Sequence, residues 1–122
     1  MANLANTIGT PSKSSNAAFT FNQGVDANLN DANNSTSVSG IGTNTYSEAR
    51  GRVTLPNPKI LSQIVVRFIG SGATSKTYFV YAYYDSSQHQ VASGVCTGSV
   101  QEVTINAAGT AWEDKQILWV EI

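Results

Sequence analysis

The stretch that decides the fold is "LSQIVVRFI", residues 61–69. Apolar and mixed positions alternate along it with a period of two, which predicts an extended strand. Successive side chains of a strand point to opposite faces of its sheet. We therefore expect one face to carry Ile64, Val66 and Phe68, and the other Val65, Arg67 and Ile69.

Strand signals recur on both sides of this stretch, and no helical period runs beyond one or two turns. We expect strands at "EARGRVTL" (48–55), "KTYFVYAYY" (76–84), "HQVASGVCT" (89–97), "VQEVTIN" (100–106) and "QILWVEI" (116–122). Pro56 and Pro58 are expected to close the first of these, because proline cannot donate to a strand ladder. The first half reads as loops with short extended pieces and one short helical turn in "NAAFTFNQGVD" (16–26). Together these signals predict an all-β antiparallel sandwich, formed as a single domain over 1–122.

Composition excludes several classes of function. Charged residues make up only 12% of the 122 residues, and the net charge is −1, so we expect no broad attraction to nucleic acid or to anionic membranes. The only close basic pair, Arg50 and Arg52, is expected to lie on a solvated face. No apolar run approaches the ~18 residues of a membrane-spanning helix, and "MANLANTIGT" lacks the features of a signal peptide.

No catalytic constellation is visible in the sequence. Cys96 and His89 are the only residues of their kinds, and nothing near either one in the sequence orients it as a nucleophile or a base. Glu113 and Asp114 are the only adjacent acids, and adjacent side chains in a strand or loop diverge. We therefore expect a protein that is not an enzyme and requires no cofactor.

A second pattern lies in the order of segments along most of the chain. The segments are "NLANTIGTPSKSSN" (3–16), "QGVDANLND" (23–31), "RGRVTLPNPKILSQIVVRF" (50–68), "YFVYAYYDSSQ" (78–88) and "ILWVEI" (117–122). In this order they resemble the discoidin domain family, the galactose-binding-like fold also found in coagulation-factor C domains. The resemblance implies a jelly-roll sandwich. The chain departs from the family where Ala27 replaces a usual glycine, where Asp85-Ser86 replaces Asp-Gly, and where the usual Thr-x-Trp is missing.

The loop "GVDANLNDANN" (24–34) has the look of a calcium loop. An EF-hand would need glycine and glutamate where Asp31 and Ser37 stand, so that type of site is excluded. The resemblance to discoidin-type modules implies another one, a structural calcium with Asp26 as one ligand and Glu121 as the candidate for a second carboxylate. The alternative is that Asn and Asp form turns by bonding to their own backbone.

The strand "TYFVYAYY" (77–84) is apolar or aromatic on both faces. One face fills the sandwich core, and the other invites a partner, since tyrosine gives a large contact area at low entropic cost. The alternative is an interior strand covered by loops of the same chain. The predicted interface residues are Phe79, Tyr81, Tyr83 and Trp119.

Trp112 and His89 are the candidates for a ligand site in loops at one end of the sandwich. A loop tryptophan can stack on a sugar ring, while the alternative is an anchor that closes the end of the sandwich. His89 sits at a predicted turn, either lining the same end or simply exposed to solvent.

These features lead to two functional expectations. The first is a non-enzymatic structural protein of a virion, namely a bacteriophage capsid decoration or tail appendage. Such a protein would be made in the host cytoplasm and would contact protein neighbours as a homo-oligomer. It rests on a self-contained, weakly charged domain with its own initiator methionine and no export signal. The second is a lectin-like module that binds glycans through the end loops, with Trp112 and His89.

Overall fold

The computed structural model describes residues 9–29, 39–42, 46–70 and 76–122, and in these ranges the protein is all-β with antiparallel strand pairs. This confirms the predicted fold class. Contacts divide the chain into two compact units. The first comprises the chain up to Pro56 together with Glu121, and the second comprises Asn57–Val120 together with Ile122. The expectation of a single domain over 1–122 stays a prediction.

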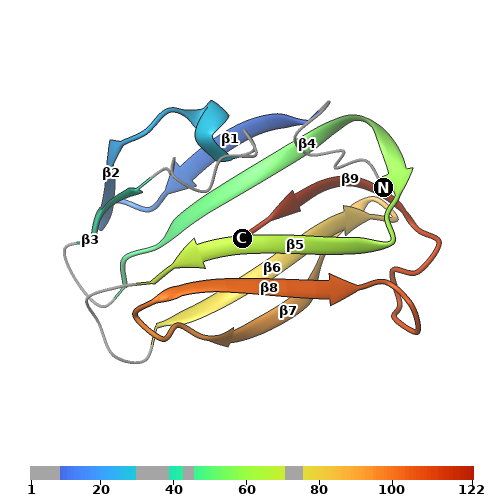
Figure 1. Ribbon diagram of the computed structural model, residues 1–122. Helices are drawn as coiled ribbons and strands as arrows, with labels where there is room; N and C mark the ends of the chain where they lie inside the picture. The colour runs from blue at the N-terminus through green and yellow to red at the C-terminus, as the bar shows by residue number, and fades with distance from the viewer. Residues whose placement is uncertain (1–8, 30–38, 43–45, 71–75) are drawn as a thin grey trace. The chain divides into compact units, whose positions relative to one another are not determined.

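One sheet of the second unit is the pair β5 (Gln63–Ile69) and β8 (Val100–Asn106) (Figure 1). The predicted alternation of β5 is confirmed. Ile64 is buried and Val66 and Phe68 are half-buried, whereas the other face is exposed, with Val65, Arg67 and Ile69. β8 alternates in the same way and pairs with β5 along its whole length. One face of the pair is therefore apolar and covered, and the other meets solvent.

The other sheet of the second unit is built from β9 (Gln116–Glu121), β6 (Thr77–Tyr84) and β7 (Ser87–Val95), in that order. Both sheets contribute to one hydrophobic core, which makes this unit a sandwich. The buried core residues are Ile64, Val80, Ala82, Tyr84, Ala107, Trp112 and Ile117.

A two-residue turn joins β6 to β7. Asp85 and Ser86 both have positive φ, 50° and 63°, and Tyr84 pairs with Ser87 on either side of them. Two central residues with positive φ define the type I′ turn, whose twist matches that of the flanking strands. Asp85 also accepts a hydrogen bond from the Lys115 ammonium group at 2.7 Å, and this contact raises the pKa of Lys115.

The first unit contains three strands that the sequence reading missed and one that it placed. β1 (Thr10–Ser15) pairs with β4 (Ala49–Ile60), and β2 (Phe19–Gln23) pairs with β3 (Ser39–Gly42). β1 is rich in Ser and Thr, and β3 in Gly and Ser, so neither carries the apolar period that marks a strand. The expected helical turn in "NAAFTFNQGVD" is wrong over β2. A 3-10 helix, η1 (Asp26–Leu29), begins only at the last residue of that segment.

Asn16 organises the turn between β1 and β2. Its side-chain oxygen accepts hydrogen bonds from the backbone N–H groups of Ala18 and Glu48, and its amide nitrogen donates to the Tyr46 carbonyl. A single asparagine thereby supplies turn bonding to its own neighbours and to the segment that enters β4.

The prediction that Pro56 and Pro58 end their strand is wrong, because β4 continues to Ile60. The pairing with β1 stops at Thr54, before either proline. Pro56 and Pro58 are two residues apart, so the backbone N–H groups that they lack would both point to the same edge of the strand. An extended backbone with a φ near −65° accommodates both where no donor is required on that side.

Candidate functional site

The first predicted calcium ligand, Asp26, is bonded to a lysine. It begins η1 and accepts a hydrogen bond from the Lys13 ammonium group. Lys13 lies directly opposite Gly51 in the β1–β4 pair. The side chain of Leu29, from the same helix, packs onto Gly51, where a Cβ atom would be only 3.1 Å from it. Helix η1 therefore covers the sheet face that carries Lys13.

The second predicted ligand, Glu121, is buried beneath two arginines. Only 2% of it is exposed, and its two oxygens accept hydrogen bonds from Arg50 Nη1 at 3.3 Å and Arg52 Nε at 2.8 Å. Arg50 also bonds Glu48, and the pKa of Arg50 is raised by this bond and by the charges of Glu48 and Glu121. The Arg50 and Arg52 side chains are 42% and 35% exposed, as expected for a solvated pair, but they also neutralise a buried carboxylate, which the sequence did not predict.

The two predicted calcium ligands lie on opposite faces of the first unit's sheet. Arg50 and Arg52 flank Gly51, so their side chains point away from the face of Lys13 and η1. Each carboxylate has its own cationic partner, and the described residues contain no group of three His, Cys, Asp or Glu side chains that could hold a metal. Asp31 lies outside the described residues. Asp26 and Glu121 therefore do not fit one shared calcium ion.

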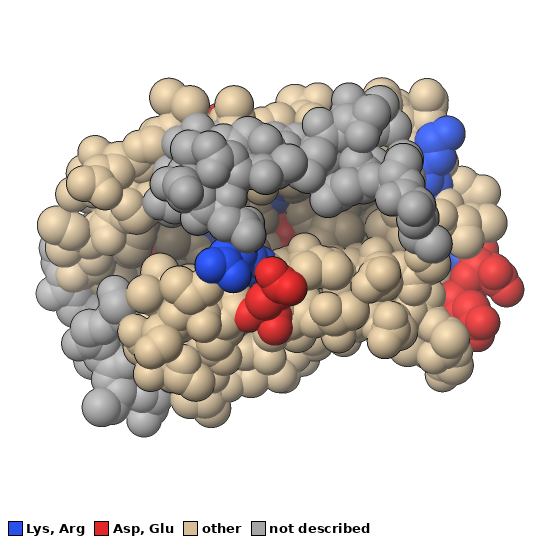
Figure 2. Space-filling view, viewed as in Figure 1, with Lys and Arg blue, Asp and Glu red and all other residues tan. Residues whose placement is uncertain are grey.

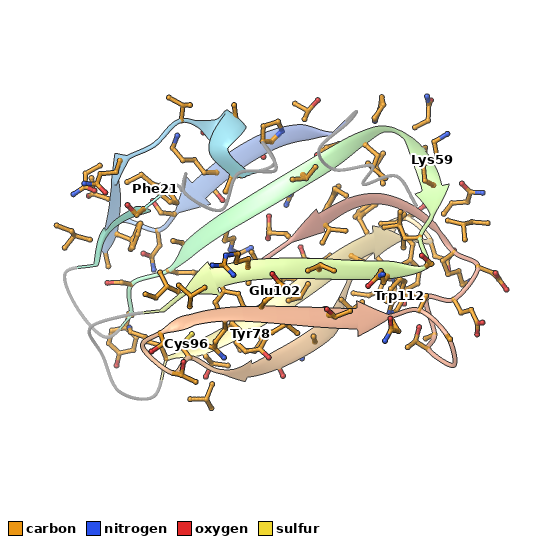
Figure 3. The ribbon with its side chains drawn as sticks, viewed as in Figure 1. Phe21, Lys59, Tyr78, Cys96, Glu102 and Trp112 are labelled. Carbon is orange, nitrogen blue, oxygen red and sulfur yellow. The ribbon has the colours of Figure 1, made fainter. Side chains whose placement is uncertain are left out.

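Trp112 belongs to the core and not to an open loop site. It is 3% exposed and packs with Ile64, Val80 and Ile117. The bonds Thr110 N–H to Ala107 carbonyl and Lys115 N–H to Trp112 carbonyl fold the segment between β8 and β9 into turns. Figure 3 shows Trp112 at the end of the unit opposite to Cys96. The anchor interpretation therefore fits Trp112, whose ring offers no face to a sugar.

His89 makes the nearest approach to a catalytic pair among the described residues. Its Nε2 lies 2.9 Å from the Ser87 hydroxyl oxygen and 3.1 Å from the Tyr84 carbonyl oxygen. A carbonyl can only accept, so its contact favours the tautomer with the proton on Nε2. That nitrogen then cannot take a proton from Ser87. The imidazole ring also stacks on Tyr84 at 3.9 Å, which gives His89 a place in the structure of the hairpin.

The aromatic row of β6 lies on the face opposite to its core residues, as the sequence predicted. Phe79 is 42% exposed, while Tyr81 and Tyr83 are half-buried. Phe79 and Tyr81 are nearly parallel with ring centres 6.3 Å apart. Tyr83 stacks on Trp119 of β9 at 5.3 Å. Trp119 is only 8% exposed, and it alternates along β9 in step with the core residue Ile117, so its predicted interface role stays a prediction.

A polar row runs beside the aromatic row on β7. Phe79 lies opposite Ser93, Tyr81 opposite Gln90, and Tyr83 opposite Gln88. The three β7 residues are exposed, and neither β6 nor β7 contains a Lys, Arg, Asp or Glu. We call the aromatic row of β6 and this polar row of β7 the outer face. It is an uncharged surface on rigid strands, and the sequence reading identified its aromatic half only.

Charged groups are also sparse over β5 and β8. Figure 2 shows a basic and an acidic side chain side by side among mostly uncharged residues, and Arg67 lies 3.8 Å from Glu102 across this strand pair. The cross-strand pair Ile69 and Val100 is more than half exposed. Both described solvent-facing surfaces of the second unit therefore favour contacts that do not depend on net charge.

The chain was compared with known proteins in three ways: no family model, no curated protein and no solved structure matches it. Among the described residues, no helix is long and apolar enough to span a membrane.

Proposed function

We propose that this chain is a non-enzymatic structural component of a larger protein assembly, of the virion type expected from the sequence, and that its outer face contacts a protein neighbour. The observation that carries the proposal is the uncharged aromatic row of β6, in which Phe79 is 42% exposed while Tyr81 and Tyr83 are half-buried. Aromatic residues are enriched and charged residues depleted at the centres of protein interfaces. The proposal includes a capsid or tail location for the assembly.

Tyr81 stands in the middle of this row, which makes it the residue to test. We expect Tyr81→Ser to weaken binding to a shell or tail protein at least tenfold, because central aromatic residues dominate interface energies. The measurement is biolayer interferometry against the proteins encoded beside this chain. Val65→Ser is the matched control, since Val65 is an exposed apolar residue on β5. Absence of binding to every one of these proteins would count against the proposal.

A second candidate function is recognition of a neutral glycan by the same outer face. Its support is the row of amide and hydroxyl side chains beside the aromatic row, because sugars present both apolar ring faces and hydroxyl groups. Because Trp112 is buried, the glycan-binding residues in this proposal are Tyr81 and Gln90. A glycan array tests this function, and a signal unchanged by Tyr81→Ser contradicts it.

We also propose that the strands form a jelly roll of discoidin type. Support comes from the sequence segments that carry the resemblance, which fall on β4, on β6 with its type I′ turn, and on β9.

A further inference from the structure

Among the described residues several strands pair on one side only, and two of them, β1 of the first unit and β7 of the second, differ in how their free edges are protected. β1 pairs with β4, and β7 pairs with β6. Free edges invite pairing with another chain, and proteins block them with proline, with lysine or with bulges. β1 contains Pro11 and Lys13. β7 contains neither, and none of its nine residues is charged.

The one protective feature of β7 is a bulge. Val80 pairs with Ala92 and Tyr81 with Gln90, so Val91 has no partner in β6. Both Val91 and Ala92 pack against the core. The bulge bends the strand at this point and leaves Ser87–Gln90 as a regular, uninterrupted edge next to the turn.

The turn determines which backbone groups of this edge are free. In a two-residue hairpin the pair that closes the turn, here Tyr84 and Ser87, is hydrogen-bonded, and bonded pairs then alternate with non-bonded pairs. Ala82 and His89 form the next bonded pair. The N–H and C=O groups of Gln88 and Gln90 therefore point away from β6, toward the free edge.

We propose that this edge pairs with the same edge of a second copy, antiparallel and about a two-fold axis at His89. In this register Gln88 of one copy lies opposite Gln90 of the other, and the axis repeats the pair. Both residues have their free backbone groups on this side, so each pair exchanges both main-chain hydrogen bonds. Their side-chain amides lie next to each other on the outer face, where each can donate and accept.

A second copy suits this edge better than a different protein because the edge is uncharged. A symmetric contact brings identical side chains together, and like charges opposite one another are destabilising. The edge carries no charge, and the whole chain carries a net charge of only −1. The pairing also ends naturally, since the turn at Asp85 and Ser86 bounds the paired residues on one side and the bulge at Val91 bounds them on the other.

The test is a charge swap across the proposed axis, followed by sedimentation velocity from about 1 µM to about 1 mM, the range in which small interfaces dissociate. We expect the wild type to dimerise with rising concentration. Gln88→Lys/Gln90→Lys and Gln88→Glu/Gln90→Glu should each stay monomeric, and an equimolar mixture should dimerise, because opposite charges then face each other. Gln63→Lys/Thr104→Lys adds the same charge at exposed positions of β5 and β8 and should behave as wild type.

Amide exchange by NMR supplies a second readout. The amides of Gln88 and Gln90 should exchange more slowly as dimer forms, whereas that of His89 should not change. A wild type that is monomeric throughout, or charged variants that dimerise as the wild type does, would overturn the proposal. The result is separate from the proposed function, because loss of binding to a shell or tail protein leaves the edge dimer intact.

Discussion

At the scale of single residues, Glu121 shows how a buried charge is accommodated. The closing strand "ILWVEI" is apolar apart from this glutamate, so its carboxylate needs cationic partners once it leaves water. Arg50 and Arg52 are two residues apart on β4 and reach it from the same side. The same pattern could have been read from the sequence, where these two are the only close basic pair.

We expect Glu121→Gln to lower the free energy of unfolding by about 2 kcal/mol, because it leaves two arginines without their shared counter-charge. The measurement is urea denaturation followed by far-UV circular dichroism. Glu48→Gln is the control, since Glu48 contacts the same Arg50 from an exposed position, and it should cost under about 0.5 kcal/mol. Equal losses in the two variants would contradict the assigned role of Glu121.

Cys96 gives a pH-dependent prediction. Burial raises the pKa of its thiol above the ordinary value of 9.0, so the folded state holds the proton at pH values where the unfolded state has lost it. The resulting stabilisation is present below pH 9.0 and is lost as the pH rises through the folded-state pKa. We expect slow modification by a disulfide reagent at pH 8 and a large increase on unfolding in urea. A folded-state rate that levels off below pH 9.0 would show that the pKa is not raised.

At the scale of elements, the β6–β7 hairpin combines an unusual turn sequence with regular pairing in the residues next to the turn. Asparagine-glycine is the favoured pair for a type I′ turn, and here aspartate and serine occupy both positive-φ positions. Replacing Ser86 by glycine removes the steric cost of that backbone conformation.

We expect Ser86→Gly to stabilise the protein by about 1 kcal/mol, as measured by thermal unfolding. Ser87→Gly, one residue later in β7, is the matched control. It should destabilise the protein by about 0.5–1 kcal/mol, because glycine in a strand loses more conformational freedom on folding and the contact between the Ser87 hydroxyl and His89 is removed. If both substitutions shift the midpoint in the same direction, the turn is not under the proposed strain.

Some strands could be predicted from the sequence and others could not. β5 and β8 could be placed because their apolar residues recur with a period of two, and β6 because it is a run of aromatic and apolar residues that ends at a turn. β1 could not, since its register depends on pairing with β4 and not on its own apolar content. Trp112 shows the same limit for the site, because a loop tryptophan is assigned to core or to ligand only by its neighbours. The partners of Asp26 and Glu121 likewise come from strands distant in sequence.

At the scale of the whole molecule, buried residues are distributed unevenly between the units. Among the described residues, the first unit contributes only Leu55 and Glu121 to the buried set, and the second contributes all the others. Regions with few buried apolar contacts open at lower free energy than the global unfolding reaction.

We therefore expect amide hydrogen exchange to be faster in β1, β2 and β3 than in β6 and β9, by at least tenfold under native conditions. Mass spectrometry of peptides from timed exchange gives the comparison. Uniform protection in all these strands would show that the two units open together.

The positions of the two tryptophans have an optical consequence. Trp112 and Trp119 are both buried in the second unit, whereas the first unit contributes only phenylalanines and Tyr46. Emission excited at the red edge of the absorption band therefore reports on the second unit alone. A fluorescence-detected melting curve would look like a single cooperative transition even if the first unit had already opened.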